Sequence, residues 1–301
     1  MLAFILHAPD SLIARVALDR FGRPLPPFDP TRWENHDSTI IGLAVLSALY
    51  LWGIAPYRRR AGIAEKAGPW QIASFFGGIL VAYLALNGPV HDLSDYYLFS
   101  VHMTQHLMLT QLMPPLLLMG VPAFVLRPLI RPRWVRAVAG FLSRPVVAFS
   151  LYSVCFSAWH LQGAYDLMMR NHNVHIFTHL QFMVTAVIMW WPILSPLREY
   201  PRLSYGGQLI YLFLLGIPMM FVAALITLAD VVLYPWYAPA PRVLGFTPLD
   251  DQKLGGLMMW VPGGLFYWGV MTVVFFRWVA REKRLDAEEA SQREARQAPA
   301  G

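Results

Sequence analysis

Histidine is the residue type in this chain best suited to chemistry, and seven of its nine histidines lie near one edge of the apolar segments. These seven are His91, His102, His106, His160, His172, His175 and His179. In the pairs His102/His106 and His175/His179 the residues are four apart, which puts both imidazoles of a pair on one helix face, one turn apart. Imidazole is a common metal ligand, and histidine is costly inside a bilayer. The spacing therefore predicts a shared metal or cofactor site.

Most of these histidines lie within or beside long apolar stretches of the sequence, each about as long as a membrane-spanning helix. Of 301 residues, 56% are hydrophobic and 14% are charged, compared with about 25% charged in soluble domains. Seven runs approach the roughly 20 residues that span a hydrocarbon core as a helix: 39–57, 70–88, 97–119, 145–162, 173–196, 206–229 and 255–278. Alternating strands of a membrane barrel are absent from the sequence. We predict an all-α polytopic membrane protein with about seven transmembrane helices in one bundle.

The polar ends of the chain flank this bundle. We expect an extramembrane N-terminal segment over 1–38, a seven-helix transmembrane domain over 39–278 and a charged cytoplasmic tail over 279–301. The N-terminal apolar stretch 1–8 is too short for a cleavable signal peptide.

Basic residues predict the orientation. Segments on one side of the predicted spans hold 17 of the 24 Lys and Arg residues, and segments on the other side hold seven. The positive-inside rule then places the N-terminus outside and the C-terminus in the cytoplasm. The net charge of +6 thus reflects loops beside the membrane, and we expect no nucleic-acid partner.

In this orientation the histidines share one depth. His102, His106, His160, His175 and His179 fall in the outer third of their spans, and they are the predicted metal ligands. Met258 lies near the same level and is the sixth candidate. Imidazole together with a thioether suits copper, in particular Cu(I).

Residues in the outer loops are candidates for orienting these ligands. Asp92 and Asp251 offer carboxylates that can hydrogen-bond a ligating imidazole. His91 and His172 lie in the same outer loops. The single cysteine, Cys155, excludes a disulfide within the chain and a Cys-x-x-Cys metal motif.

Four stretches together resemble a known family. They are VHMTQHLMLTQLMPPLLLMGVP (101–122), Trp159-His160, the His175/His179 pair followed by Trp190-Trp191-Pro192, and LDDQKLGGLMMWVPGG (249–264). In this order they resemble the membrane-integral cytochrome c oxidase assembly factors of the CtaG family, associated with caa-type oxidases. The resemblance covers about 90–278 and adds Gln252, beside Asp251, to the residues around the site.

The resemblance implies a multi-pass protein of the bacterial inner (cytoplasmic) membrane that is needed to build a haem–copper oxidase. It implies a non-enzymatic metallochaperone that binds copper near the periplasmic face and helps insert it into an oxidase subunit. Its implied partners are the catalytic subunit of the oxidase, a periplasmic copper carrier and the lipid bilayer.

Other functions remain open on the sequence alone. Facing helices with one histidine each can hold a b-type haem by bis-histidine ligation, which would make a membrane redox protein. A zinc-dependent intramembrane hydrolase needs a general base such as the glutamate of His-Glu-x-x-His, and neither histidine pair encloses a carboxylate. An ion transporter would need polar residues across the whole membrane, whereas here they gather on one side.

Overall fold

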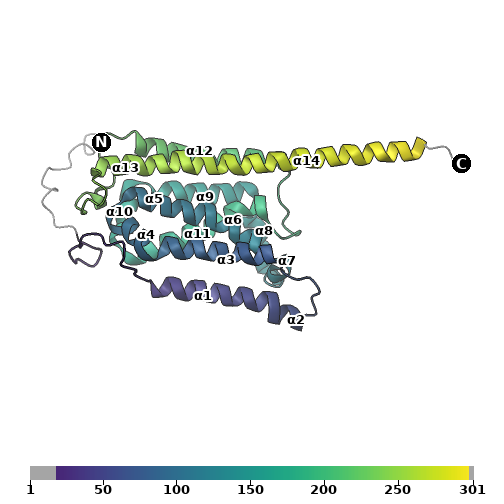
Figure 1. Cartoon of the computed structure of the whole chain (residues 1–301), viewed down its shortest axis with the longest axis horizontal. Helices are drawn as coiled ribbons and strands as arrows, with labels where there is room; N and C mark the ends of the chain where they lie inside the picture. The colour runs from purple at the N-terminus through teal and green to yellow at the C-terminus, as the bar shows by residue number, and fades with distance from the viewer. Residues whose placement is uncertain (1–17, 298–301) are drawn as a thin grey trace.

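The computed structural model describes residues 18–297, and the predictions for 1–17 and 298–301 lie outside this part. Helices dominate the described chain, whose extended pairing is limited to an isolated bridge between Leu18 and Pro24. The prediction of an all-α protein is therefore confirmed. Figure 1 shows the helices lying roughly parallel in one bundle, with α1 along one side and α14 along the opposite side and far beyond it.

The predicted apolar runs coincide with helices. The matching elements are α1 (Asp37–Trp52), α3 (Pro69–Leu86), α5 (Phe99–Leu107) continued by α6 (Met113–Gly120), α9 (Pro145–Trp159), α11 (His172–Leu194), α12 (Tyr205–Thr227), and α13 (Pro248–Met258) continued by α14 (Gly264–Gln297). Shorter helices connect them: α2 (Arg58–Arg60), α4 (Gly88–Asp92), α7 (Ala123–Leu126), α8 (Arg133–Leu142) and α10 (Gln162–Arg170).

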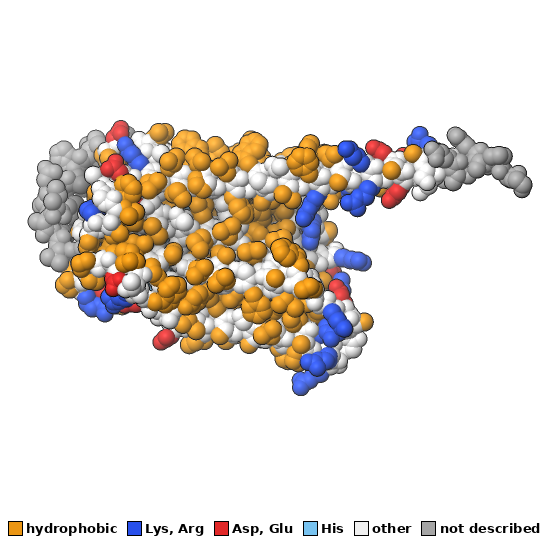
Figure 2. All heavy atoms as spheres, in the orientation of Figure 1, with side chains coloured by type: hydrophobic (Ala, Val, Ile, Leu, Met, Phe, Trp, Pro, Cys, Tyr) orange, Lys and Arg blue, Asp and Glu red, His pale blue; other side chains and the backbone are white. Residues whose placement is uncertain are grey.

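Five helical stretches of the described chain are long and apolar enough to cross a membrane, and a sixth is possible if α8 and α9, bent by 72°, form one span. The stretch formed by α5 and α6 is not among them. It contains the polar residues His102, Gln105, His106 and Gln111, which are buried inside the bundle. Figure 2 shows hydrophobic side chains over the flank of the bundle and Lys and Arg gathered at the end near α2 and α14.

Two π-helical segments of five residues each flank the helix that carries His102 and His106. The π-helical segments η4 (Leu93–Tyr97) and η5 (Met108–Leu112) lie before and after α5. Leu98, with an extended backbone, separates η4 from α5. The second π-helical segment ends just before α6, whose first turn contains Pro114 and Pro115. A proline lacks a backbone N–H group, and the first turn of a helix is where this loss is tolerated.

Two local features fix the helices that carry the site. The side chain of Asn171 accepts hydrogen bonds from the backbone N–H groups of Asn173 and Val174, which starts α11 so that its histidines lie on the first two turns. Helix α13 packs closely on α5 because Gly255 faces Phe99. A Cβ at Gly255 would clash with the ring of Phe99.

Candidate metal centre

Three histidines from two helices meet inside the bundle. One ligand nitrogen from each of His102, His106 and His179 lies within 4.8 Å of the other two. Their relative exposures are 0%, 5% and 5%. The ring centroids of His102 and His106 on α5 are 4.3 Å apart, and the ring of His179 on α11 lies 5.5 Å from that of His106. We call these three residues the histidine triad.

The other two predicted histidine ligands lie against this triad. His160, at the C-terminal end of α9, has its ring centroid 6.2 Å from that of His106. His175 lies one turn before His179, with their centroids 4.4 Å apart. The structure thus brings all five predicted histidines together, from α5, α9 and α11.

The hydrogen-bond partners of His102 define which nitrogen is free. His102 Nδ1 lies 3.1 Å from the carbonyl oxygen of Ser94, which can only accept, so Nδ1 carries the proton. The Tyr237 hydroxyl lies 3.1 Å from the same nitrogen and donates to Ser94 O at 2.7 Å. His102 Nε2 is therefore left with a lone pair. His160 is arranged in the same way, because its Nδ1 lies 2.7 Å from the Phe156 carbonyl oxygen.

Several buried ring nitrogens lack a hydrogen-bond partner in the described part of the chain. They are Nε2 of His36, His102, His160 and His179, and both ring nitrogens of His106 and of His175. Buried polar atoms in proteins are almost always paired, because an unpaired one costs about 1–3 kcal/mol. Three orphaned imidazoles within 4.8 Å of one another fit a metal ion, which would pair all of them at once.

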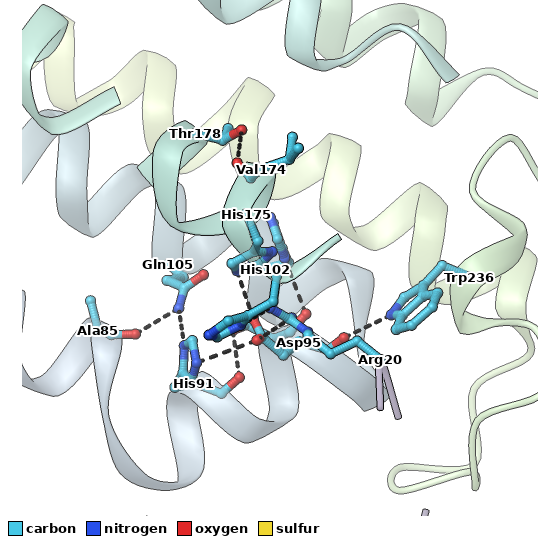
Figure 3. Close-up of polar contacts among 12 residues, drawn as sticks. Arg20, Ala85, His91, Asp95, His102, Gln105, Val174, His175, Thr178 and Trp236 are labelled. Carbon is cyan, nitrogen blue, oxygen red and sulfur yellow. Dashed lines mark hydrogen bonds and ion pairs between the residues drawn. The ribbon is translucent and has the colours of Figure 1, made fainter. Parts of the chain in front are cut away.

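A buried carboxylate that the sequence analysis missed lies beside this cluster (Figure 3). Asp95 lies on η4. Its Oδ1 is 3.3 Å from His175 Nε2, and its Oδ2 is 3.3 Å from His91 Nε2. Arg20 donates to Asp95 Oδ2 at 2.5 Å. Burial raises the pKa of Asp95, but the histidines and Arg20 outweigh burial and hold this pKa well below its usual range.

His91 is held as a neutral ring in this network. The Nε2 atom of Gln105 lies 3.2 Å from His91 Nδ1, and the same atom donates to the Ala85 carbonyl oxygen at 2.7 Å. His91 Nε2 then carries the proton that faces Asp95. Burial lowers the pKa of His91 to about 4, which keeps the imidazole uncharged at neutral pH.

The predicted orienting residues act at different places. Asp251 makes no hydrogen bond to a triad histidine; it accepts from Phe99 N at 2.7 Å, from Ser100 N at 3.2 Å and from Ser100 Oγ at 2.5 Å. It therefore caps the first turn of α5, the helix that carries His102 and His106. Gln252 accepts from Leu233 N at 2.6 Å and so ties down the loop that leads to Tyr237.

The remaining predicted residues lie at the margin of the site. His172 is exposed, and its Nδ1 is 3.5 Å from Arg20. Asp92 is half-buried beside a polar pocket with Arg32 and Glu34. Burial raises the pKa of Asp92 to about 6. Met258 ends α13 and is half-buried. Its role as a ligand stays a prediction.

Removal of the Asp251 cap is expected to destabilise the protein. The substitution Asp251→Ala leaves two backbone N–H groups and one hydroxyl without their acceptor at a position that is 1% exposed. We expect a loss of about 1–3 kcal/mol in the free energy of unfolding, measured by denaturant unfolding in detergent micelles. The matched control is Asp250→Ala, because Asp250 is exposed and its hydrogen bonds are to Thr247, the residue that precedes α13. Equal losses in the two variants would contradict the capping role.

Comparison with known proteins places these residues in a family context. The sequence matches the family described as cytochrome c oxidase caa3 assembly factor (Caa3_CtaG) over residues 48–281. Uncharacterized proteins of Mycobacterium bovis and Mycobacterium tuberculosis are each 26% identical to it over 271 residues, covering 83% of this chain and 40% of their own length. An uncharacterized protein of Mycobacterium leprae is 26% identical over 277 residues, covering 86% of this chain and 41% of its own length. The chain thus spans 40–41% of the length of these curated relatives. No solved structure matches the sequence.

Proposed function

This chain belongs to the cytochrome c oxidase caa3 assembly factor family, and from that premise we propose that it is a metallochaperone that binds copper and delivers it to a haem–copper oxidase subunit. The observation that carries the proposal is the histidine triad, whose buried nitrogens lie within 4.8 Å of one another. Imidazole is among the ligands that suit copper, and the triad offers three neutral imidazoles with no carboxylate among its members.

We further propose the arrangement that the sequence predicts: seven spans in the bacterial inner membrane, the N-terminus outside and the C-terminus in the cytoplasm. The basic helices α2 and α8 then lie on the cytoplasmic side, in agreement with the positive-inside rule. The triad lies toward the periplasmic face, where a periplasmic copper carrier can reach it. The oxidase subunit receives copper from within the membrane, and no bond of a substrate is made or broken.

Elemental analysis and a visible spectrum of protein purified without chelators test this function. We expect about one copper ion per chain, since three nitrogens complete one coordination sphere, and no Soret band. The alternative is a membrane redox protein with b-type haem, which would show a Soret band that shifts on reduction with dithionite. Such a band, or the absence of copper, would overturn the proposal.

Loss of the Tyr237 hydroxyl is expected to weaken copper binding. Tyr237 lies 3.1 Å from His102 Nδ1 and helps to fix the ring orientation and the tautomer that leaves Nε2 free. Removing such a partner of a ligating histidine costs about 10–100-fold in metal affinity. We expect this loss in Tyr237→Phe, measured by competition with a coloured Cu(I) chelator. Tyr97→Phe is the control, because the Tyr97 hydroxyl donates to Pro26 O. Unchanged affinity in Tyr237→Phe would contradict this role.

A further inference from the structure

Imidazoles continue from the triad to the surface of the bundle. The ring centroids of His179 and His175 are 4.4 Å apart, those of His175 and His91 are 6.3 Å apart, and those of His91 and His36 are 4.3 Å apart. Asp95 lies between His175 and His91, 3.3 Å from each. The series begins at half-exposed His36, at the start of α1, and ends at buried His179.

A groove on the surface of the bundle is lined by the same residues. This groove of about 890 Å³ between α1, α3 and α11 is lined by His36, His91, Asp95, His175 and His179. The helix α1 forms one wall of the groove and α11 another. The groove is thus lined both by half-exposed His36 and by buried His179, one of the triad histidines.

We propose that His36, His91, Asp95 and His175 form an access path, along which a copper ion is passed from the surface to the histidine triad. The proposal rests on the copper-binding function proposed above. The ion moves by ligand exchange: each new nitrogen or oxygen binds before the previous one leaves, and the oxidation state is unchanged. Exchange of this kind avoids an uncoordinated cation in a medium of low polarity, where a bare charge is costly.

Unpaired atoms along the access path support this role. His36 Nε2 and His175 Nδ1 are buried and have no hydrogen-bond partner among the described residues, and Asp95 Oδ1 lies 3.3 Å from His175 Nε2 without a hydrogen bond. His91 Nδ1 lies 3.2 Å from Gln105 Nε2, which also donates to the Ala85 carbonyl oxygen at 2.7 Å, so an arriving ion would displace only the longer of these two contacts. Arg20 neutralises Asp95, so an arriving cation competes with its guanidinium for the carboxylate.

The rate of copper uptake tests the access path. The variant His36→Phe keeps an aromatic ring against His91 but removes both nitrogens. We expect its uptake from a coloured Cu(I)-chelator complex to be about tenfold slower, as for the loss of one positioned metal contact. Its final copper content and its melting temperature should equal those of the wild type. His36→Met should restore most of the rate, because a thioether is a Cu(I) ligand.

The control is Ser38→Ala, a change in the same groove wall two residues along the chain, which should load at the wild-type rate. Wild-type loading in His36→Phe would overturn the access path, and so would a lower final copper content, because His36 would then hold the ion and not pass it. A wild-type protein that takes up no copper would instead overturn the proposed function itself. The two failures are therefore distinguishable.

A second observation, independent of copper, concerns the opposite end of the bundle. A crevice of about 580 Å³ lies between α6, α11, α12 and α14, and its rim carries Arg202, Arg277 and Arg281. In the described part of the chain these arginines form no ion pair, and Glu199, three residues before Arg202, pairs instead with Arg127. The crevice walls are mainly apolar, with Val270 and Val273 from α14 and Ile193 from α11.

Arg202 and Arg277 repel each other in the absence of an anion. Burial and the positive charge of Arg277 lower the pKa of Arg202. Arg202 Nε donates to the Ser195 carbonyl oxygen at 2.9 Å, so its other N–H groups remain for a ligand. Basic pockets between membrane helices at the cytoplasmic side are suited to anionic lipid headgroups.

We infer that this crevice binds an anionic phospholipid, with its phosphate on the arginines and an acyl chain between α12 and α14. Added phosphatidylglycerol should raise the melting temperature of the micelle-solubilised protein by about 2–4 °C, and phosphatidylcholine should raise it less. In Arg202→Gln/Arg277→Gln the difference between the two lipids should disappear, and in the control Arg127→Gln it should persist. An equal shift with phosphatidylcholine or with inorganic phosphate alone would overturn the inference.

Discussion

Replacement of His102 and His106 together by alanine is expected to abolish copper binding. The double variant removes two of the three imidazoles of the triad, whose ligand nitrogens lie within 4.8 Å of one another. Loss of a residue that merely orients a ligand costs about 10–100-fold in affinity, so the loss of two ligands should exceed the upper end of that range. Elemental analysis after purification without chelators measures the result.

The control for this variant lies on the same helix. Thr104, between the two histidines, is half-buried and bonds only to the Ser100 carbonyl oxygen, so Thr104→Ala should keep the copper content of the wild type. Full copper content in the double variant would mean that the ion is held elsewhere. The fold should survive the change, because both nitrogens of His106 are already unpaired.

The sequence predicted the histidine cluster because its signal is local. Two residues four apart on a helix must share a face, and helices of membrane-spanning length leave little choice of depth. For this reason His102, His106, His175 and His179 were all placed correctly beside one another. His160 followed from the same reasoning about depth, although its sequence position gave no spacing to another histidine of the cluster, and its ring lies 6.2 Å from that of His106.

The polar network around the cluster was harder to predict because its contacts are distant in sequence. Asp95 lies four residues after His91, a spacing that signals a contact within one helical turn, but its partner Arg20 comes from an irregular segment with no periodicity. Asp251 was predicted to orient a histidine directly. Its actual partners, Phe99 N and Ser100, depend on the close packing of α13 on α5, which the apolar pattern does not encode.

The number of membrane spans was also hard to predict from the sequence. Hydropathy identifies a helix by its average, and the α5–α6 stretch lowers its average with the residues that form the site. Its polar side chains are buried between helices and are not exposed to lipid. The stretch proposed here to carry the metal site is therefore one that a hydropathy criterion does not detect.

Unpaired nitrogens in the core also have a consequence for stability. Each of the buried nitrogens of His102, His106 and His179 without a partner disfavours the metal-free fold by about 1–3 kcal/mol. Ligand binding to the folded state alone adds stability by mass action. The metal-loaded protein should thus be the more stable form, and the packed aromatic core around Trp190 must compensate when no ion is bound.

The largest loss of stability is expected from Asp95→Ala. The Arg20 and Asp95 side chains are 3% and 1% exposed and lie 2.5 Å apart. Removing the carboxylate leaves a buried guanidinium without its counter-charge, which costs about 3–5 kcal/mol. The same change removes the acceptor that faces Nε2 of His91. We expect a corresponding drop in the free energy of unfolding, measured in detergent micelles.

A second variant separates the unpaired charge from general damage to the core. In Arg20→Met/Asp95→Leu both charges are replaced by apolar side chains, and replacing a buried ion pair in this way is often neutral or stabilising. The double variant should therefore recover most of the stability that Asp95→Ala loses. If it were as unstable as Asp95→Ala, the carboxylate would act through the histidines and not through Arg20. The recovered fraction thus measures how much of the role of Asp95 is to neutralise Arg20.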